Sequence, residues 1–115
     1  MTLKINLNAD IAEGFGAYDI GNDAALMTII KSANVACGFH AGDANTMQRL
    51  VMLAKQEGVS IGVHPGFNDL WGFGRRNIDM DPRDLEHMVA YQIGALQAMA
   101  RYAGLPVTHL KPHGA

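Results

Sequence analysis

The sequence predicts an α/β fold with a parallel sheet. Short stretches that favour strands, at residues 3–8, 32–38, 60–63 and 108–110, alternate with longer stretches of helical periodicity. Each strand-like stretch also ends in polar residues of the types that catalyse reactions. Right-handed crossovers would place the C-terminal ends of parallel strands on one face, where α/β folds build active sites. An enzyme is therefore the first hypothesis.

The expected strands alternate between apolar and polar positions. In residues 3–10 the odd positions are apolar and the even positions are polar, which is a period of two. In the second strand Val35 lies on the side opposite Asn34, and at the chain end Lys111 and His113 share one side. This pattern indicates an apolar face toward helices and a polar face toward a shared interior. An antiparallel sheet with one solvated face is the alternative.

Capping residues mark the helices between these strands. Three helices are expected, beginning at Asn22, Asp43 and Asp81. Asp81 suits the cap position, Pro82 suits the first helical position, and Gly104 suits a left-handed stop. The second helix is expected to stop at Gly58 in the same way. The apolar stripe of the last helix is interrupted only by Gln92.

Composition is that of a soluble globular protein, with 49% hydrophobic and 17% charged residues among 115. A formal net charge of −2 gives no electrostatic reason to expect a nucleic-acid partner. No apolar run approaches the ~20 residues of a membrane span, so no membrane partner is expected. The first residues favour a strand instead of a signal peptide, and a lone cysteine, Cys37, cannot form an internal disulfide. We therefore expect a cytoplasmic protein.

A single domain is expected over residues 1–115. The chain stops directly after a strand end rich in chemical groups, with no following helix to cover that strand. A complete (β/α) barrel takes roughly 250 residues. The sequence therefore predicts about half of such a barrel, truncated at its C-terminus.

Four motifs in the chain resemble those of one protein family. They are NLNADIAEGFG at 6–16, SANVACGFHAGD at 32–43, GFGRRN at 72–77 and HLKPHGA at 109–115. Their order and spacing resemble the LamB/YcsF family, whose members are also called the A subunit of 5-oxoprolinase. The chain departs from the family at Ala9, where many members have Cys, and at Ile11-Ala12, where Leu-Gly is commoner. The acidic residues Asp10 and Glu13 are kept.

The resemblance implies both a fold and an activity. The implied fold is an irregular parallel (β/α) barrel of the glycoside hydrolase and deacetylase type, of which this chain would be the N-terminal half. The implied activity is that of an ATP-dependent 5-oxoprolinase that works with partner subunits B and C. This enzyme opens the lactam of 5-oxo-L-proline to L-glutamate while ATP is hydrolysed. The sequence contains no P-loop that would locate the ATP, so which subunit binds it stays open.

Opening a lactam requires a base to deliver water, an acid to protonate the nitrogen, and donors or cations to stabilise negative charge. The catalytic candidates are the residues at the strand ends: Asp10, Glu13, His40, His64, Lys111 and His113. The substrate-binding candidates are Asn8, Asn34, Arg75 and Arg76. Side chains of successive residues diverge, so we expect only one of the two arginines to face the site.

Other interpretations stay open at this point. Lys111 could form a structural ion pair, and His64 could be held structurally by the extended backbone before Pro65. Metal-ligand types occur at the strand ends, in Asp10, His40, His64 and His113, although their spacing forms no compact motif. A metal-dependent hydrolase resembling polysaccharide deacetylases is therefore one alternative function. A non-catalytic lactam-binding subunit is another.

Overall fold

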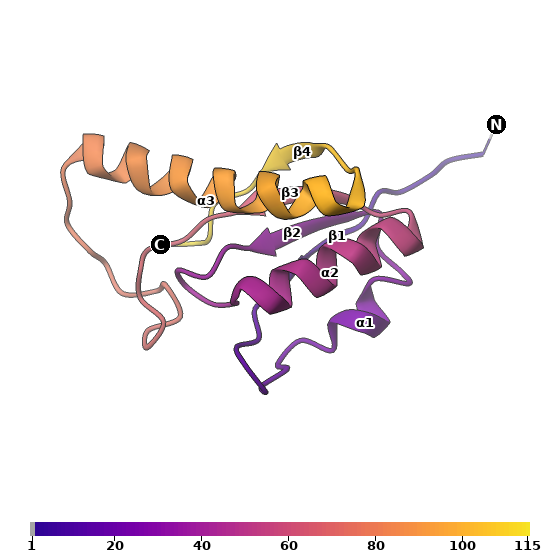
Figure 1. The fold of residues 1–115 in the computed structure, drawn as a ribbon, viewed down its shortest axis with the longest axis horizontal. Helices are drawn as coiled ribbons and strands as arrows, with labels where there is room; N and C mark the ends of the chain where they lie inside the picture. The colour runs from indigo at the N-terminus through magenta and orange to yellow at the C-terminus, as the bar shows by residue number, and fades with distance from the viewer. Residues whose placement is uncertain (1) are drawn as a thin grey trace.

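The computed structural model describes residues 2–115 and shows a parallel sheet with helices packed against one face (Figure 1). The strands are β1 (Asn8–Ile11), β2 (Ser32–Ala36), β3 (Ser60–His64) and β4 (Val107–Leu110). The helices are α1 (Asp23–Leu26), α2 (Ala44–Glu57) and α3 (Pro82–Ala103). All neighbouring strands are parallel and follow the order β1-β2-β3-β4. The predicted α/β class and parallel order are confirmed.

The first expected strand was placed wrongly. It was predicted at residues 3–8, but β1 spans Asn8–Ile11, and Leu3 and Ile5 are 88% and 80% exposed. Two contacts tie the residues before β1 to the neighbouring strand region. The carbonyl of Leu7 accepts from the backbone N–H groups of Lys31 and Ser32, and Asn6 Oδ1 accepts from Ser32 Oγ at 3.0 Å. Alternation without a partner strand or a covering layer does not make a strand. The carboxylate of Asp10 consequently belongs to β1 itself.

The two long helices begin and end where the capping residues predicted. The Asp43 side chain accepts from the Thr46 N–H at the start of α2, and that of Asp81 accepts from the Arg83 N–H at the start of α3. Both helices end at glycines in the left-handed conformation, Gly58 with φ 69° and Gly104 with φ 67°. The weaker helix α1 makes only one turn. Its cap residue, Asn22, is left-handed, and the Asn22 side chain makes no capping hydrogen bond.

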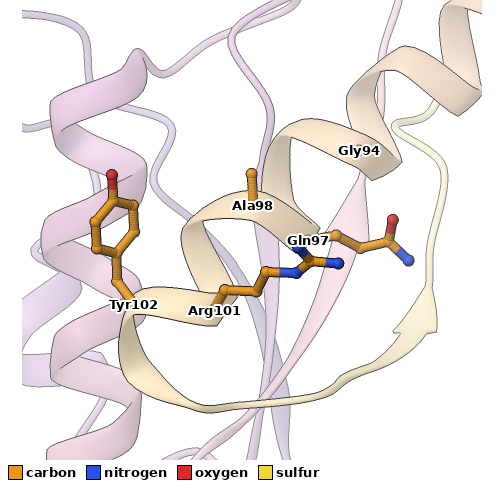
Figure 2. A pocket seen from close by; sticks show the side chains of 5 residues that line it. All are labelled: Gly94, Gln97, Ala98, Arg101 and Tyr102. Carbon is orange, nitrogen blue, oxygen red and sulfur yellow. The ribbon is translucent and has the colours of Figure 1, made fainter.

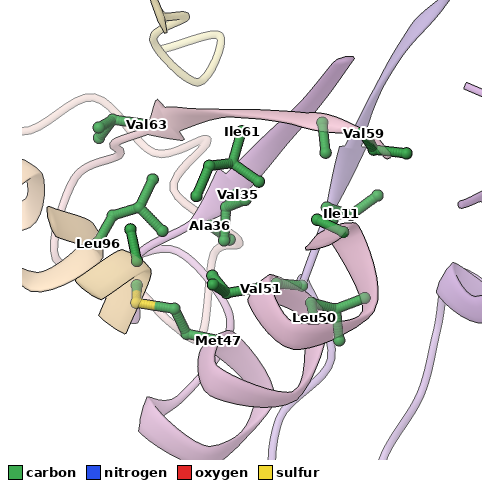
Figure 3. Packing of buried hydrophobic residues seen from close by; sticks show 14 of the residues in the cluster. Ile11, Val35, Ala36, Met47, Leu50, Val51, Val59, Ile61, Val63 and Leu96 are labelled. Atoms are coloured by element: carbon green, nitrogen blue, oxygen red, sulfur yellow. The ribbon is translucent and has the colours of Figure 1, made fainter. Parts of the chain in front are cut away.

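The apolar core lies between the sheet and helices α2 and α3 (Figure 3). Figure 3 shows side chains from three sources meeting there: Val35, Ile61 and Val63 from strands, Met47, Leu50 and Val51 from α2, and Leu96 from α3. Burial of these residues fixes which face of each strand points away from the helices. Within residues 2–115, no helix has the length and hydropathy needed to cross a membrane.

A register shift between β3 and β4 places a histidine on the face of the sheet opposite the helices. Ile61 pairs with Val107, but Gly62 pairs with His109, so Thr108 is left over. Any side chain at Gly62 would collide with the His109 ring. Glycine therefore leaves the space in which the His109 Nε2 reaches the Asn34 Oδ1, 3.0 Å away.

Candidate functional site

The C-terminal ends of the four strands bring together six residues that the sequence singled out as catalytic candidates. Asp10 lies in β1 and Glu13 just after it, whereas His40 lies in the loop after β2. His64 ends β3, and the backbone after β4 carries Lys111 and His113. They form two neighbouring groups: a buried histidine cluster and an ion pair beside it.

The histidine cluster consists of Glu13, His40, His64 and His113. One nitrogen or oxygen from each residue lies within 4.8 Å of the others. The three imidazoles are buried, with exposures of 1%, 0% and 8%, and the Glu13 side chain is 16% exposed. The closest contact joins His40 Nε2 to Glu13 Oε2 at 2.6 Å, and the rings of His40 and His113 stack with centroids 3.8 Å apart.

Backbone carbonyls fix the orientation of two of these rings. The His64 Nδ1 lies 2.6 Å from the carbonyl oxygen of Lys111, and the His113 Nε2 lies 2.7 Å from that of Phe73. A carbonyl can only accept, so both of these ring nitrogens donate. The remaining nitrogens, His64 Nε2 and His113 Nδ1, face the cluster. Burial lowers the pKa of His64 and of His113, which favours the neutral rings.

The ion pair joins Lys111 and Asp10 across the mouth of the strands. The Lys111 Nζ donates to both Asp10 oxygens, at 2.8 and 3.0 Å. Burial alone would raise the pKa of Asp10, but the hydrogen bond from Lys111, the nearby His64 and the Asn34 amide bring it below its ordinary value. The two side chains are 49% and 32% exposed, so the lysine ammonium is accessible to a ligand.

Asn34 holds the carboxylate of this pair in place. Its Nδ2 donates to Asn8 Oδ1 at 3.0 Å and to Asp10 Oδ1 at 3.1 Å, and its Oδ1 contacts His109 Nε2. Asn34 was expected to bind substrate, but its amide is buried and fully engaged in orienting its neighbours. Asn8 is exposed and remains accessible. Sequence reasoning did not single out His109, although it shares the parity of Lys111 and His113 along the chain.

The two adjacent arginines point in different directions, as their adjacency predicted. Arg76 forms an ion pair with Asp69, whose carboxylate also accepts from the Gly72 N–H at 3.0 Å. The hydrogen bond from Arg76 lowers the pKa of Asp69 to about 2. Arg75 instead lies against Gly114, next to His113. Arg75 therefore borders the site, whereas Arg76 anchors its own loop.

Buried polar residues outside the expected set hold the surrounding loops. Gln92 accepts from the Gly66 N–H and donates to its carbonyl, both at 3.0 Å, which ties α3 to the loop after β3. The polar interruption of an otherwise apolar stripe was its sequence signal. Asp23 accepts from the Ala12 N–H at 3.0 Å, and burial raises its pKa; no local sequence signal identified this contact. Burial also raises the pKa of the Cys37 thiol to about 12, which agrees with its expected core position.

The hollows on the surface differ in their relation to the site. An apolar pocket of about 270 Å³ borders His113 and is lined mainly by the loop after β3, α3 and the end of the chain, including Phe67, Met88 and Pro112. Another hollow lies along α3 and is lined by Gly94, Gln97, Ala98, Arg101 and Tyr102 (Figure 2). These five residues include neither a carboxylate nor an imidazole. Of these two hollows, the pocket beside His113 is the one adjacent to the candidate chemistry.

Comparisons with known proteins agree on one family. The LamB/YcsF family model matches residues 5–115. The chain is 56% identical to the A subunit of 5-oxoprolinase from Gluconobacter oxydans, covering 100% of this chain and 46% of that protein. It is 54% identical to the A subunit of 5-oxoprolinase from Coprothermobacter proteolyticus, covering 100% of this chain and 44% of that protein.

A solved structure agrees with the sequence relatives. It is the lactam utilization protein from Thermus thermophilus, which superposes with a TM-score of 0.94 at 48% identity. The match covers 97% of this chain and 45% of that one. The chain thus spans about half the length of the relatives that it matches.

Proposed function

Since the chain belongs to the LamB/YcsF family, we propose that it forms part of the A subunit of an ATP-dependent 5-oxoprolinase. The observation that carries this proposal is the 54–56% identity, over the whole chain, to proteins named as the A subunit of 5-oxoprolinase. The proposed reaction converts 5-oxo-L-proline to L-glutamate while ATP becomes ADP and phosphate. Of the functions that the sequence left open, the names of these relatives favour this one.

The groups at the strand ends suit the proton transfers of lactam opening. Water must lose a proton as it attacks the carbonyl carbon, and the ring nitrogen must gain one as the C–N bond breaks. Neutral imidazoles beside the Glu13 carboxylate can accept and donate such protons near neutral pH. We assign these proton transfers to the histidine cluster.

The ion pair supplies positive charge at the same mouth. Negative charge develops on the lactam oxygen, or on a phosphoryl group transferred to it, and a preorganised cation there lowers the barrier. The Lys111 ammonium is held by both Asp10 oxygens and remains half exposed, which leaves it able to contact such an oxygen. Arg75 is the candidate for binding the substrate carboxylate, since a guanidinium can bind it through two hydrogen bonds.

ATP enters the proposal through the chemistry of the amide. Transfer of the γ-phosphoryl group to the lactam oxygen would make the ring carbon electrophilic. Addition of water and cleavage of the C–N bond would then leave an acyl phosphate, which a second water hydrolyses to glutamate and phosphate. We place partner subunits B and C in this reaction because the relatives are named as one lettered subunit of the enzyme. A cytosolic setting, with its ATP supply, is part of the proposal.

Reconstitution of the complete gene product with its partner subunits tests the proposal. Glutamate released from 5-oxo-L-proline is measured with and without ATP, alongside ADP formation. We expect glutamate and ADP to appear together and Glu13→Gln to abolish both, while the exposed His87→Ala on α3 serves as the matched control. Folded, assembled enzyme that forms no glutamate from the lactam in the presence of ATP would refute the assignment.

A further inference from the structure

The histidine cluster brings two imidazole nitrogens and a carboxylate oxygen together in a buried place. Because His64 Nδ1 and His113 Nε2 donate to carbonyls, His64 Nε2 and His113 Nδ1 are the ring nitrogens left to bind a ligand. These two nitrogens lie 3.2 Å apart. The carboxylate oxygen Glu13 Oε2 lies 3.6 Å from the first and 3.8 Å from the second. Three potential ligand atoms thus converge in a buried place, from three different strand ends.

The dimensions of this triangle indicate what fits inside it. The point equidistant from atoms with separations of 3.2, 3.6 and 3.8 Å lies about 2 Å from each, which is the length of a Zn–N or Zn–O bond. A water molecule needs about 2.7–3.0 Å to each hydrogen-bond partner, so it would have to lie well out of the plane of the three atoms.

We infer that Glu13, His64 and His113 bind a divalent transition-metal ion of the zinc type through Oε2, Nε2 and Nδ1. Two imidazoles and one carboxylate are a frequent protein ligand set for catalytic zinc, and they leave a fourth position for water or substrate. The carbonyls of Lys111 and Phe73 complete the arrangement, because metal-bound imidazoles usually donate their other N–H to such acceptors. This metal site goes beyond the proposed function, which specifies no metal. With an ion bound, His64 Nε2, His113 Nδ1 and Glu13 Oε2 would be ligands, so a water molecule at the fourth position, and not these groups, would supply the base of the proposed reaction.

His40 and Asp10, both expected as ligands from the sequence, have other partners. The His40 Nε2 lies 2.6 Å from the ligand oxygen of Glu13 and is suited to donate to it, which makes His40 a positioning residue. Its Nδ1 is buried and has no hydrogen-bond partner within residues 2–115. Both oxygens of Asp10 already accept from Lys111.

Direct metal binding to the complete gene product tests this inference without substrate or ATP. Protein freed of metal by a chelator is titrated with Zn²⁺ in a calorimeter and with Co²⁺ while visible absorption is recorded. We expect one equivalent of either ion to bind, and we expect bound Co²⁺ to show the visible absorption bands of a four-coordinate site. Glu13→Gln and His113→Ala should weaken binding by about 100-fold or more, and His40→Asn by about 10-fold.

The surface variant His87→Ala should bind metal as the unaltered protein does, because His87 is exposed on α3. Circular dichroism verifies that each variant is folded, and Glu13→Gln preserves side-chain size where the buried histidine variant could disturb packing. Folded protein that takes up neither ion would overturn the inference. Equal metal affinity in Glu13→Gln and the unaltered protein would overturn it as well. Neither result depends on 5-oxoprolinase activity.

Discussion

Ala12 occupies a backbone conformation that normally calls for glycine. Its φ is 61°, in the left-handed region, and its side chain is fully buried. The backbone N–H of Ala12 donates to Asp23, and Glu13 of the histidine cluster follows directly. Glycine adopts the left-handed region without a steric penalty, so Ala12→Gly asks how much the backbone conformation of this loop costs the protein.

Three terms decide the effect of Ala12→Gly on the free energy of unfolding. Removing an L-residue from the left-handed region gains roughly 1–2 kcal/mol. The greater freedom of glycine in the unfolded chain costs about 0.4–1 kcal/mol, and the buried methyl group is worth about 0.8 kcal/mol. These terms nearly cancel, so we expect Ala12→Gly to be close to neutral.

The matched control is Ala54→Gly in α2. Ala54 is equally buried, at 0% exposure, but lies inside a helix. Glycine in a helix interior costs about 1 kcal/mol, and the lost methyl group adds about 0.8 kcal/mol. Ala54→Gly should therefore destabilise the protein by about 2 kcal/mol, in contrast to Ala12→Gly.

Urea unfolding of the complete gene product, followed by circular dichroism, measures the free energy of unfolding of each variant. The comparison is valid when the variants have the same m-value, the slope of that free energy against urea concentration. The difference between the two variants isolates the left-handed backbone and should be about 1–2 kcal/mol. That corresponds to a melting-temperature difference of several degrees. If the two variants lose the same stability, the backbone at Ala12 is not strained and the reasoning fails.

The other predictions concern charged side chains. Lys111→Met should lower turnover of the reconstituted enzyme by about 10²–10³-fold. The melting temperature should change little, because the ion pair of Lys111 is half exposed. A lowered melting temperature with normal turnover per folded molecule would show that Lys111 has a structural role instead. The pKa of Asp23 is higher in the folded protein than in the unfolded chain, where it has the ordinary aspartate value. The free energy of unfolding should therefore fall as pH rises from the unfolded-state pKa through the folded-state pKa. Asp23→Asn should abolish that fall in urea unfolding, whereas Asp23→Ala should cost about 1–3 kcal/mol by leaving the Ala12 N–H unpaired. The pKa of Asp69, lowered to about 2, adds stability that is present above pH 3.8 and lost as pH falls toward 2; Arg76→Gln should flatten that loss in an acid titration.

The parts of the fold that sequence predicted well are those with local causes. Asp81 and Pro82 start α3, and Gly104 ends it, through contacts and dihedral preferences within one turn. The strand at 3–8 was predicted wrongly because strand formation needs a partner, and alternation says nothing about whether one is present. Leu3 and Ile5 satisfy the pattern yet lie exposed.

In the candidate site, too, the sequence predicted features with local causes and missed those that depend on distant residues. Alternation along the last strand and its extension placed Lys111 and His113 toward the shared face, and the contacts with Asp10 and His64 are consistent with that placement. The partner of each side chain depended on distant residues: the Phe73 carbonyl, 40 residues away, sets which nitrogen of His113 faces the cluster.

The choice between Arg75 and Arg76 shows why sequence reasoning stops where it does. Adjacency alone establishes that the two side chains diverge, and it favours neither for the site. Asp69 decides, because its carboxylate is buried and needs a cation, and Arg76 is the guanidinium that reaches it. Arg75 is then left beside Gly114 and His113. A residue that carries no candidate chemistry thus selects which arginine borders the site, through an ion pair that no local pattern encodes.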